Sequence, residues 1–173
     1  MNPSDRRNTE YSHRRNRRRN GQPSAELPVD HAAPWRDAVI DTATGLRVRL
    51  AATLRDAIGV RDVLHDAWRV RDDEPYFYND FNDPEAVYRR CIQPLMQASD
   101  IRDIAVLCVV AEDMADRPGR IVGTGSLVLD HQRRTIEFGR GAVARSAQGA
   151  GVLSQIVALA KMLLQHVPDY ALI

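Results

Sequence analysis

The most constraining feature of this sequence is a strand, a loop of small residues and an amphipathic helix that follow one another directly. Residues 135–143 predict a strand, and residues 144–151 are mostly Ala, Gly and Ser. The helix after them has an apolar stripe, Pro168 ends it, and residues 169–173 begin another strand. Such a unit predicts a right-handed crossover and a parallel pair of strands. The stripe consists of Leu153, Ile156, Val157, Ala160, Leu163, Leu164 and Val167.

Upstream of this unit, the sequence predicts one strand and two helices. Residues 45–51 alternate with a period of two, which is typical of a half-buried strand. Thr53 then caps a helix, and the segment Asp83-Pro84-Glu85 begins a second helix that Pro94 disturbs. The residues that recur at helical spacing in the first helix are Leu54, Ala57, Ile58, Arg61, Leu64, Ala67 and Trp68.

Two more strands are expected before the strand at 135–143. The continuous apolar run at 104–111 predicts a buried strand, and a turn at 116–119 connects it to a strand at 121–129. Residues 130–132 then close a hairpin. This order of elements predicts an α/β (α+β) fold, with a mixed, mainly antiparallel sheet flanked by helices.

The charge of the chain is balanced overall but unevenly placed. The 173 residues hold 24 basic and 23 acidic side chains, and a net charge of +1 excludes a protein whose whole surface binds nucleic acid. Residues 1–34 hold seven Arg, four acids and few aliphatic residues, so we predict a disordered arm there and one domain over 35–173. The Arg run at 14–19 is a nucleic-acid contact, a targeting signal or a solvated tail.

Composition also limits the compartment and the metal chemistry. No apolar run approaches the length of a membrane span, and no apolar segment follows the Arg run as in a signal peptide. We therefore expect a cytoplasmic protein with no membrane partner. Two cysteines exclude a disulfide scaffold, and Cys91 and Cys108 are expected to be buried thiols rather than metal ligands.

The loop at 144–151 carries the chemistry to which the sequence points. The first amide groups of a helix have no partner within it, and the helix dipole places partial positive charge there. Small side chains let an anion approach that backbone, and Arg145 and Gln148 are candidate side-chain donors. The pattern favours a phosphate or pyrophosphate site, with a plain helix start as the alternative. No Gly-x-x-x-x-Gly-Lys loop is present, and Gly139–Ala144 matches a dinucleotide motif only inside a strand.

The segment Gln148-Gly149-Ala150-Gly151-Val152, between a strand and a long amphipathic helix, resembles the signature of the GNAT acyltransferase superfamily. That signature is Gln or Arg, two residues, Gly, one residue, then Gly or Ala, and Leu153 departs from it. The resemblance covers about residues 46–173. It implies acetyl-CoA as co-substrate, no metal, and a strand bulge at Gly139 and Gly141 beside the pantetheine arm. The implied cofactor-binding residues are Ala142, Val143, Arg145, Gln148, Gly149, Ala150, Gly151 and Val152.

The resemblance further implies a reaction, in which an amine attacks the thioester directly and takes the acetyl group. A carboxylate on the strand before the loop often serves as general base, and Glu137 is the matching residue. Burial among apolar neighbours would raise its pKa, while the alternative is a surface residue or an ion pair with Arg140. The acidic, aromatic stretch at 72–83 would favour a cationic small-molecule or peptide amine, or it is a solvated loop.

The resemblance leaves the extent and the activity of the chain open. Family members continue past the last strand through another helix and two more strands, so we expect an incomplete domain that is poorly soluble or inactive alone. A non-catalytic CoA-binding or regulatory module is one alternative function. A nucleic-acid-associated protein acting through the Arg arm is another, and a homodimer is also left open.

Overall fold

The computed structural model describes residues 33–68 and 83–173. The arm expected at 1–34 and the acidic stretch at 72–83 therefore lie almost entirely outside the described residues. In chain order the elements are β1 (Val39–Asp41), β2 (Leu46–Leu50), α1 (Leu54–Trp68), α3 (Pro84–Val87), the π-helical turn η1 (Tyr88–Ile92), α4 (Gln93–Gln97), the 3-10 turn η2 (Ile101–Asp103), β3 (Val106–Asp113), β4 (Arg120–Asp130), β5 (Thr135–Val143), the 3-10 turn η3 (Arg145–Ala147), α5 (Val152–Leu164) and β6 (Ala171–Leu172).

The described strands form one six-stranded sheet in the order β1-β2-β3-β4-β5-β6. All neighbouring strands are antiparallel except β5 and β6, which are parallel. The parallel pair follows from the crossover through α5, as the strand–loop–helix–strand pattern predicted. The mixed, mainly antiparallel sheet flanked by helices is thus confirmed.

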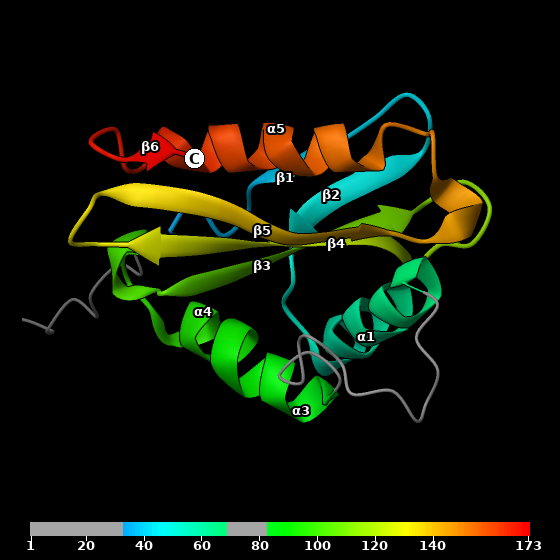
Figure 1. Ribbon diagram of the computed structural model, residues 1–173, viewed down its shortest axis with the longest axis horizontal. Coiled ribbons are helices and arrows are strands. Elements are labelled where there is room, and N and C mark those ends of the chain that lie inside the picture. Colours follow the sequence, from blue (N-terminus) through cyan, green and yellow to red (C-terminus); the bar gives the residue numbers. More distant parts are fainter. Residues whose placement is uncertain (1–32, 69–82) are drawn as a thin grey trace, which may run out of the picture. The chain divides into compact units, whose positions relative to one another are not determined.

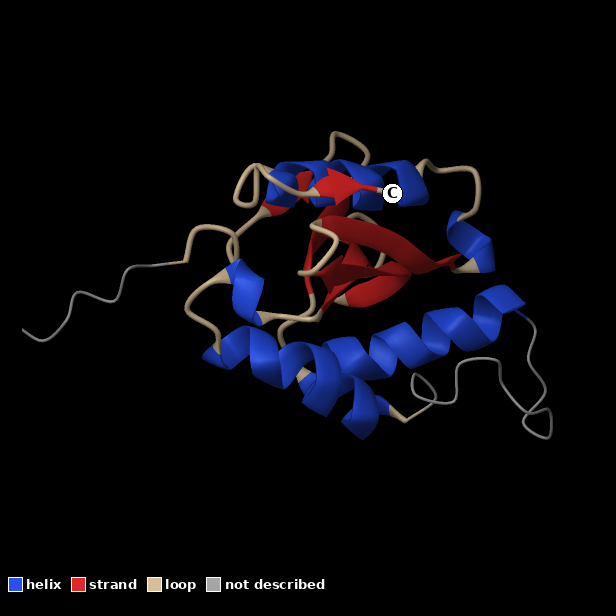
Figure 2. Cartoon of the chain, turned by 60° about the vertical axis from the view of Figure 1, so that its left-hand side comes forward, coloured by secondary structure: helices blue, strands red, loops and turns tan. Residues whose placement is uncertain are grey.

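Helices cover both faces of this sheet. Helix α5 lies along one face, while α1, α3 and α4 lie on the other (Figure 1), and the turned view shows the same three layers (Figure 2). Alternation along the strands divides the core between the two faces. Gly123 of β4 faces Val152 and Ile156 of α5, whereas Cys108 of β3 lies on the opposite face with Thr124.

Strand β1 was not predicted from the sequence. It has only three residues, and Val39 at its start is exposed, so it lacks the apolar alternation that marks a strand. It forms because a tight turn returns the chain onto β2. In that turn Gly45 has a φ of 78°, and Thr42 donates its amide to the Leu46 carbonyl at 2.9 Å.

Helix α1 begins as predicted after Thr53 but turns a different face to the sheet. Leu54, Ile58 and Trp68 of the expected stripe are exposed, and the buried residues include Val60 and Val63. A close approach to β4 explains the difference. A Cβ on Gly59 would lie 2.5 Å from Cγ1 of Ile121, so this side of the helix can pack directly on the strand. The remaining buried residues of the helix are Asp56, Ala57 and Leu64.

Asp56 joins the start of α1 to the sheet. Its carboxylate accepts two hydrogen bonds from the Arg49 guanidinium, at 2.9 and 2.8 Å, and others from the amides of Ala52 and Thr53. Burial alone would raise the pKa of Asp56, but the hydrogen bonds outweigh it and hold the pKa below its usual value. Arg49 also pairs with Glu112 of β3 at 3.2 Å. This network fixes α1 against β2 and β3.

The second helical segment has the predicted start and the predicted disturbance. The Asp83 side chain accepts from the Glu85 amide at 2.9 Å, and Pro84 occupies the first helical position. Pro94 has no amide hydrogen, and its ring would crowd the carbonyl of Arg90 in a regular helix. The widened π-helical turn η1 accommodates it.

Candidate active site

Strand β5 is bulged near its end. Gly139 pairs with Ser126 of β4, and Ala142 pairs with Thr124. Arg140 and Gly141 therefore together oppose the single β4 residue between them, Gly125. Arg140 has a φ of 53°, which is uncommon for a residue with a side chain. Ser126 donates its hydroxyl to the Gly139 carbonyl at 3.0 Å, beside the bulge. The bulge expected in this strand is confirmed.

Beyond the bulge, β5 presents one free edge. The Ala144 amide donates to the Val122 carbonyl of β4, and by the alternation of antiparallel strands the backbone groups of Val143 point the other way. By the same alternation Ala142 faces β4. Pairing with β6 extends only to Phe138, so within the described residues no strand pairs with the Val143 edge.

The loop between β5 and α5 has the backbone that its glycines permit. Gly149 and Gly151 have φ values of 83° and 73°, a region that other residues seldom adopt. No atom would lie within 4 Å of a Cβ on either glycine. Both glycines, Gln148 and Ala150 are exposed. The loop is therefore open toward solvent in front of α5.

Several amide groups at and before the start of α5 have no acceptor. Among the described residues, none accepts from the amides of Gly149, Gly151, Val152, Leu153 or Ser154. The helix dipole adds partial positive charge at the same place, and no side chain caps the helix. This arrangement can bind a phosphate or pyrophosphate through backbone groups alone.

Arg145 and Gln148 differ in what their polar groups contact. The Arg145 amide donates to a carboxylate oxygen of Asp66 of α1 at 2.7 Å, so it is not one of the amides without an acceptor. The Arg145 side chain is exposed. The Gln148 side-chain amide lies 3.5 Å from the Val143 carbonyl, which places it at the free edge of β5.

The amino-acid sequence matches no protein-family model and no curated protein. Solved structures do match. The ribosomal-protein-S5-alanine acetyltransferase of Vibrio fischeri is 17% identical, with a TM-score of 0.55 over 75% of this chain and 68% of that chain. An aminoglycoside acetyltransferase from an uncultured soil metagenomic sample is 12% identical, with a TM-score of 0.53 over 76% of this chain and 77% of that chain. A protein assigned to the GNAT family from Desulfovibrio desulfuricans is 16% identical, with a TM-score of 0.51 over 71% and 68%. The chain has the GNAT fold.

Within this GNAT fold, the residue that departs from the signature lies over the bulge. Leu153 was expected on the buried stripe of its helix, but it is exposed, and Val152 is buried instead. A Cβ on Gly141 would lie 2.9 Å from Cδ1 of Leu153. The Leu153 side chain therefore covers the bulge from the α5 side, where the signature has Gly or Ala.

Glu137 lies on the face of the GNAT-fold sheet that is opposite to α5. It pairs with Val128, and its neighbours Ile136 and Phe138 point to the α5 face. Glu137 is exposed, so of the two alternatives the surface residue is observed and burial among apolar neighbours is not. Among the described ion pairs, none joins Glu137 to Arg140.

The other polar groups in the interior do not form a second reactive centre. Cys91 and Cys108 are free and buried, and burial raises the pKa of Cys91 to about 11 and that of Cys108 to about 12. Within residues 33–68 and 83–173, no cluster of His, Cys, Asp and Glu could hold a metal ion. In the same part of the chain, no helix has both the length and the apolar character that crossing a bilayer requires.

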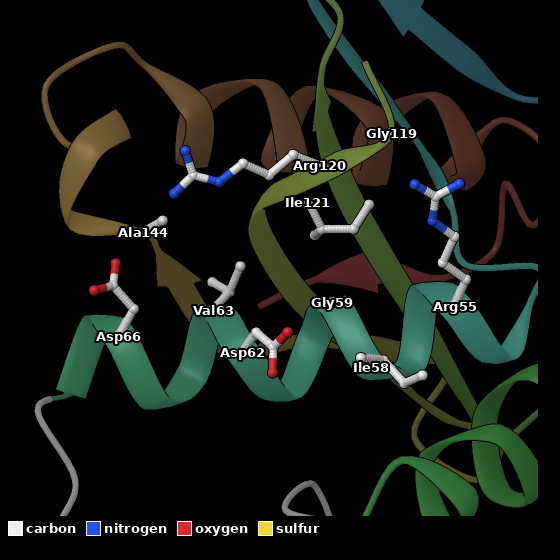
Figure 3. Close-up of a pocket in the computed structure, with 10 residues that line it drawn as sticks. All are labelled: Arg55, Ile58, Gly59, Asp62, Val63, Asp66, Gly119, Arg120, Ile121 and Ala144. Carbon is white, nitrogen blue, oxygen red and sulfur yellow. The ribbon is translucent and has the colours of Figure 1, made fainter. Parts of the chain in front are cut away.

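One residue beside the candidate site was not found from the sequence. Asp66 contacts Arg145 of the loop, 79 positions later in the sequence. The sequence pattern indicates only that Asp62 and Asp66 are charged residues on the exposed face of a helix. Asp66 lines a pocket of about 240 Å³ between α1 and the start of β4, which Ala144 closes at one end (Figure 3). We call this the α1–β4 pocket. No local sequence pattern predicts such a contact, because it depends on how α1 packs against the sheet.

Proposed function

We propose that this protein transfers an acyl group from acetyl-CoA to an amine. The observation that carries the proposal is the group of unpartnered amides at the start of α5, next to the free edge of a bulged strand, in a GNAT fold. The structural neighbours are acetyltransferases, which supports acyl transfer in general. The amine acceptor and the residue roles below are part of the proposal.

The residues present fit the pyrophosphate of acetyl-CoA. Gly149 and Gly151 have positive φ, and no atom would lie within 4 Å of a Cβ on either, so the loop is open to a bulky anion. In the loop from Gln148 to Val152, the acceptor-free amides of Gly149, Gly151 and Val152 would bind the pyrophosphate, while those of Gln148 and Ala150 donate within the loop. Arg145 and Gln148 would be side-chain donors. The backbone of Val143 would pair with the pantetheine arm. The Val143 amide, at the free edge, would donate a hydrogen bond to the thioester oxygen.

Acetyl-CoA supplies a thioester whose carbonyl carbon an amine can attack. As the new C–N bond forms, the C–S bond breaks and CoA leaves as the thiolate, which takes a proton from solvent. The amine must lose a proton, and Glu137 is the proposed base on the strand that carries the bulge. Because Glu137 is exposed, we assign it the proton transfer through a water molecule rather than from within an apolar pocket. No residue of the protein needs to form a covalent bond with the acyl group.

Calorimetry with acetyl-CoA, followed by a transfer assay, tests the proposal. We expect the full chain to bind acetyl-CoA, and to release free CoA when a small amine or a peptide amine is added. Replacing Glu137 with Gln should leave binding unchanged and slow the release at least about tenfold. Absence of acetyl-CoA binding would refute the proposal. Binding of acetyl-CoA without acyl transfer to either kind of amine would favour the non-catalytic CoA-binding module instead.

A further inference from the structure

The loop that precedes α5 is anchored by a residue of a distant helix. Asp66, in the last turn of α1, accepts a hydrogen bond from the Arg145 amide at 2.7 Å. Arg145 is the first residue of η3, and the residue before it, Ala144, provides no side-chain cap. Asp66 therefore supplies the capping acceptor that the local sequence lacks.

This contact is the shortest side-chain hydrogen bond to the loop in the described residues. The Arg120 guanidinium lies 3.3 Å from the Ser146 hydroxyl, and the Gln148 side chain lies 3.5 Å from the Val143 carbonyl. A hydrogen bond that involves a carboxylate is roughly twice as strong as one between neutral groups. The Asp66 contact is thus the main side-chain restraint at the start of the loop.

The surroundings of Asp66 allow it to be changed without disturbing the core. Asp66 is exposed and lines the α1–β4 pocket with Ala144 at its end (Figure 3). Asp62 lies one turn earlier on the same helix and lines the same pocket, but it pairs with Arg61 at 2.7 Å. Asp62 has the same charge and a similar exposure without the loop contact, so it is a matched control.

We propose that Asp66 is a positioning residue for acyl-CoA binding. It holds the start of the loop in place, so the acceptor-free amides of Gly149 and of Gly151 to Ser154 are in position before the ligand arrives. A loop that is already ordered loses less conformational entropy when it binds, and this raises affinity without any contact between Asp66 and the ligand. The inference rests on the proposed function, and it concerns a residue that lies outside the proposed binding groups.

The test compares the wild type with D66N, D66A and D62A. The Asn side chain keeps a neutral acceptor, and Ala removes the acceptor altogether. We expect the dissociation constant for acetyl-CoA, measured by calorimetry, to rise about threefold in D66N and about tenfold in D66A. D62A should bind as the wild type does. Equal affinity in all variants would overturn the inference, and so would an equal loss in D62A.

Hydrogen exchange without ligand provides a readout that does not depend on CoA. The Arg145 amide should exchange faster in D66N than in the wild type, and faster still in D66A, while amides in β3 stay unchanged. Unchanged Arg145 exchange would overturn the inference even if affinity fell. If the wild type binds no acetyl-CoA, the proposed function fails, and this exchange series alone decides whether Asp66 orders the loop. Should D66A not fold, the D66N arm supplies the same comparison.

Discussion

Glycines on the two sides of Val152 meet different requirements. Beneath α5, a Cβ on Gly123 would overlap Cγ1 of Val152 and lie 3.3 Å from Cβ of Ala111, so the strand needs glycine for space. In front of α5, Gly149 and Gly151 have positive φ and open space around them. The same residue type therefore provides packing space in one region and a positive-φ backbone in the other. Variants of the two regions should therefore affect different quantities.

The largest effect is expected at Gly151. Replacing it with Asp puts a carboxylate at the site proposed for pyrophosphate, and like charges placed together cost several kcal/mol. We expect acetyl-CoA affinity to fall by about 100-fold or more, measured by calorimetry. Asn has nearly the same shape and tolerates left-handed backbone, so G151N should retain most of the affinity. Equal losses in both variants would show that backbone shape, rather than charge, governs the site.

The next largest effect is expected at Gly123, and on stability. An Ala there must displace the buried Val152, and overpacking of this kind costs about 1–3 kcal/mol. The free energy of unfolding, measured with urea, should fall by that amount. Gly139 is the control, because its Cβ would meet only the Ser126 hydroxyl at 3.7 Å. If G139A destabilised the protein as much as G123A, space beneath α5 would not be the deciding factor.

Thiol reactivity offers a third way to separate the two regions. Burial raises the pKa values of Cys91 and Cys108 to about 11 and about 12, so both thiols are protonated at pH 8 and shielded from reagents. A colorimetric thiol reagent should react about tenfold faster with G123A than with the wild type, because local opening becomes easier. The G151D variant should react as slowly as the wild type. A fast reaction in G151D would mean that the loop and the core open together.

The smallest effect is expected at Leu153, which lies between the two regions. Its side chain is 41% exposed and covers the bulge at Gly141, so it contributes little to the core. We expect L153A to change the free energy of unfolding by less than about 0.5 kcal/mol. It should raise acetyl-CoA affinity a few-fold, because the ligand no longer has to displace the side chain. Weaker binding in L153A would indicate that Leu153 contacts the ligand favourably.

Local patterns predicted most of the sheet and the loop, but not the relations between distant segments. The strand at 135–143 follows from its local pattern and the parallel β5–β6 pair from the crossover rule, whereas the bulge was implied by the family resemblance; all three are observed. The buried face of α1 was predicted wrongly, since the contact of Gly59 with Ile121 decides it. Asp66 left no sequence signal, because its partner is on another element. Exposure of Glu137 likewise depends on which helices cover the sheet.

The order of the strands also has a consequence for how the protein folds. Strands β3, β4 and β5 are joined by short turns, so their pairings are local in sequence, and we expect this meander to form early. The β5–β6 pairing joins strands separated by the loop and α5, and its register has only two residue pairs. The chain must close a longer loop to form this pair than to form the pairs joined by short turns, and this costs more conformational entropy. The segment proposed to hold acyl-CoA would thus assemble later than the meander, so ligand binding would show that this late stage of folding is complete.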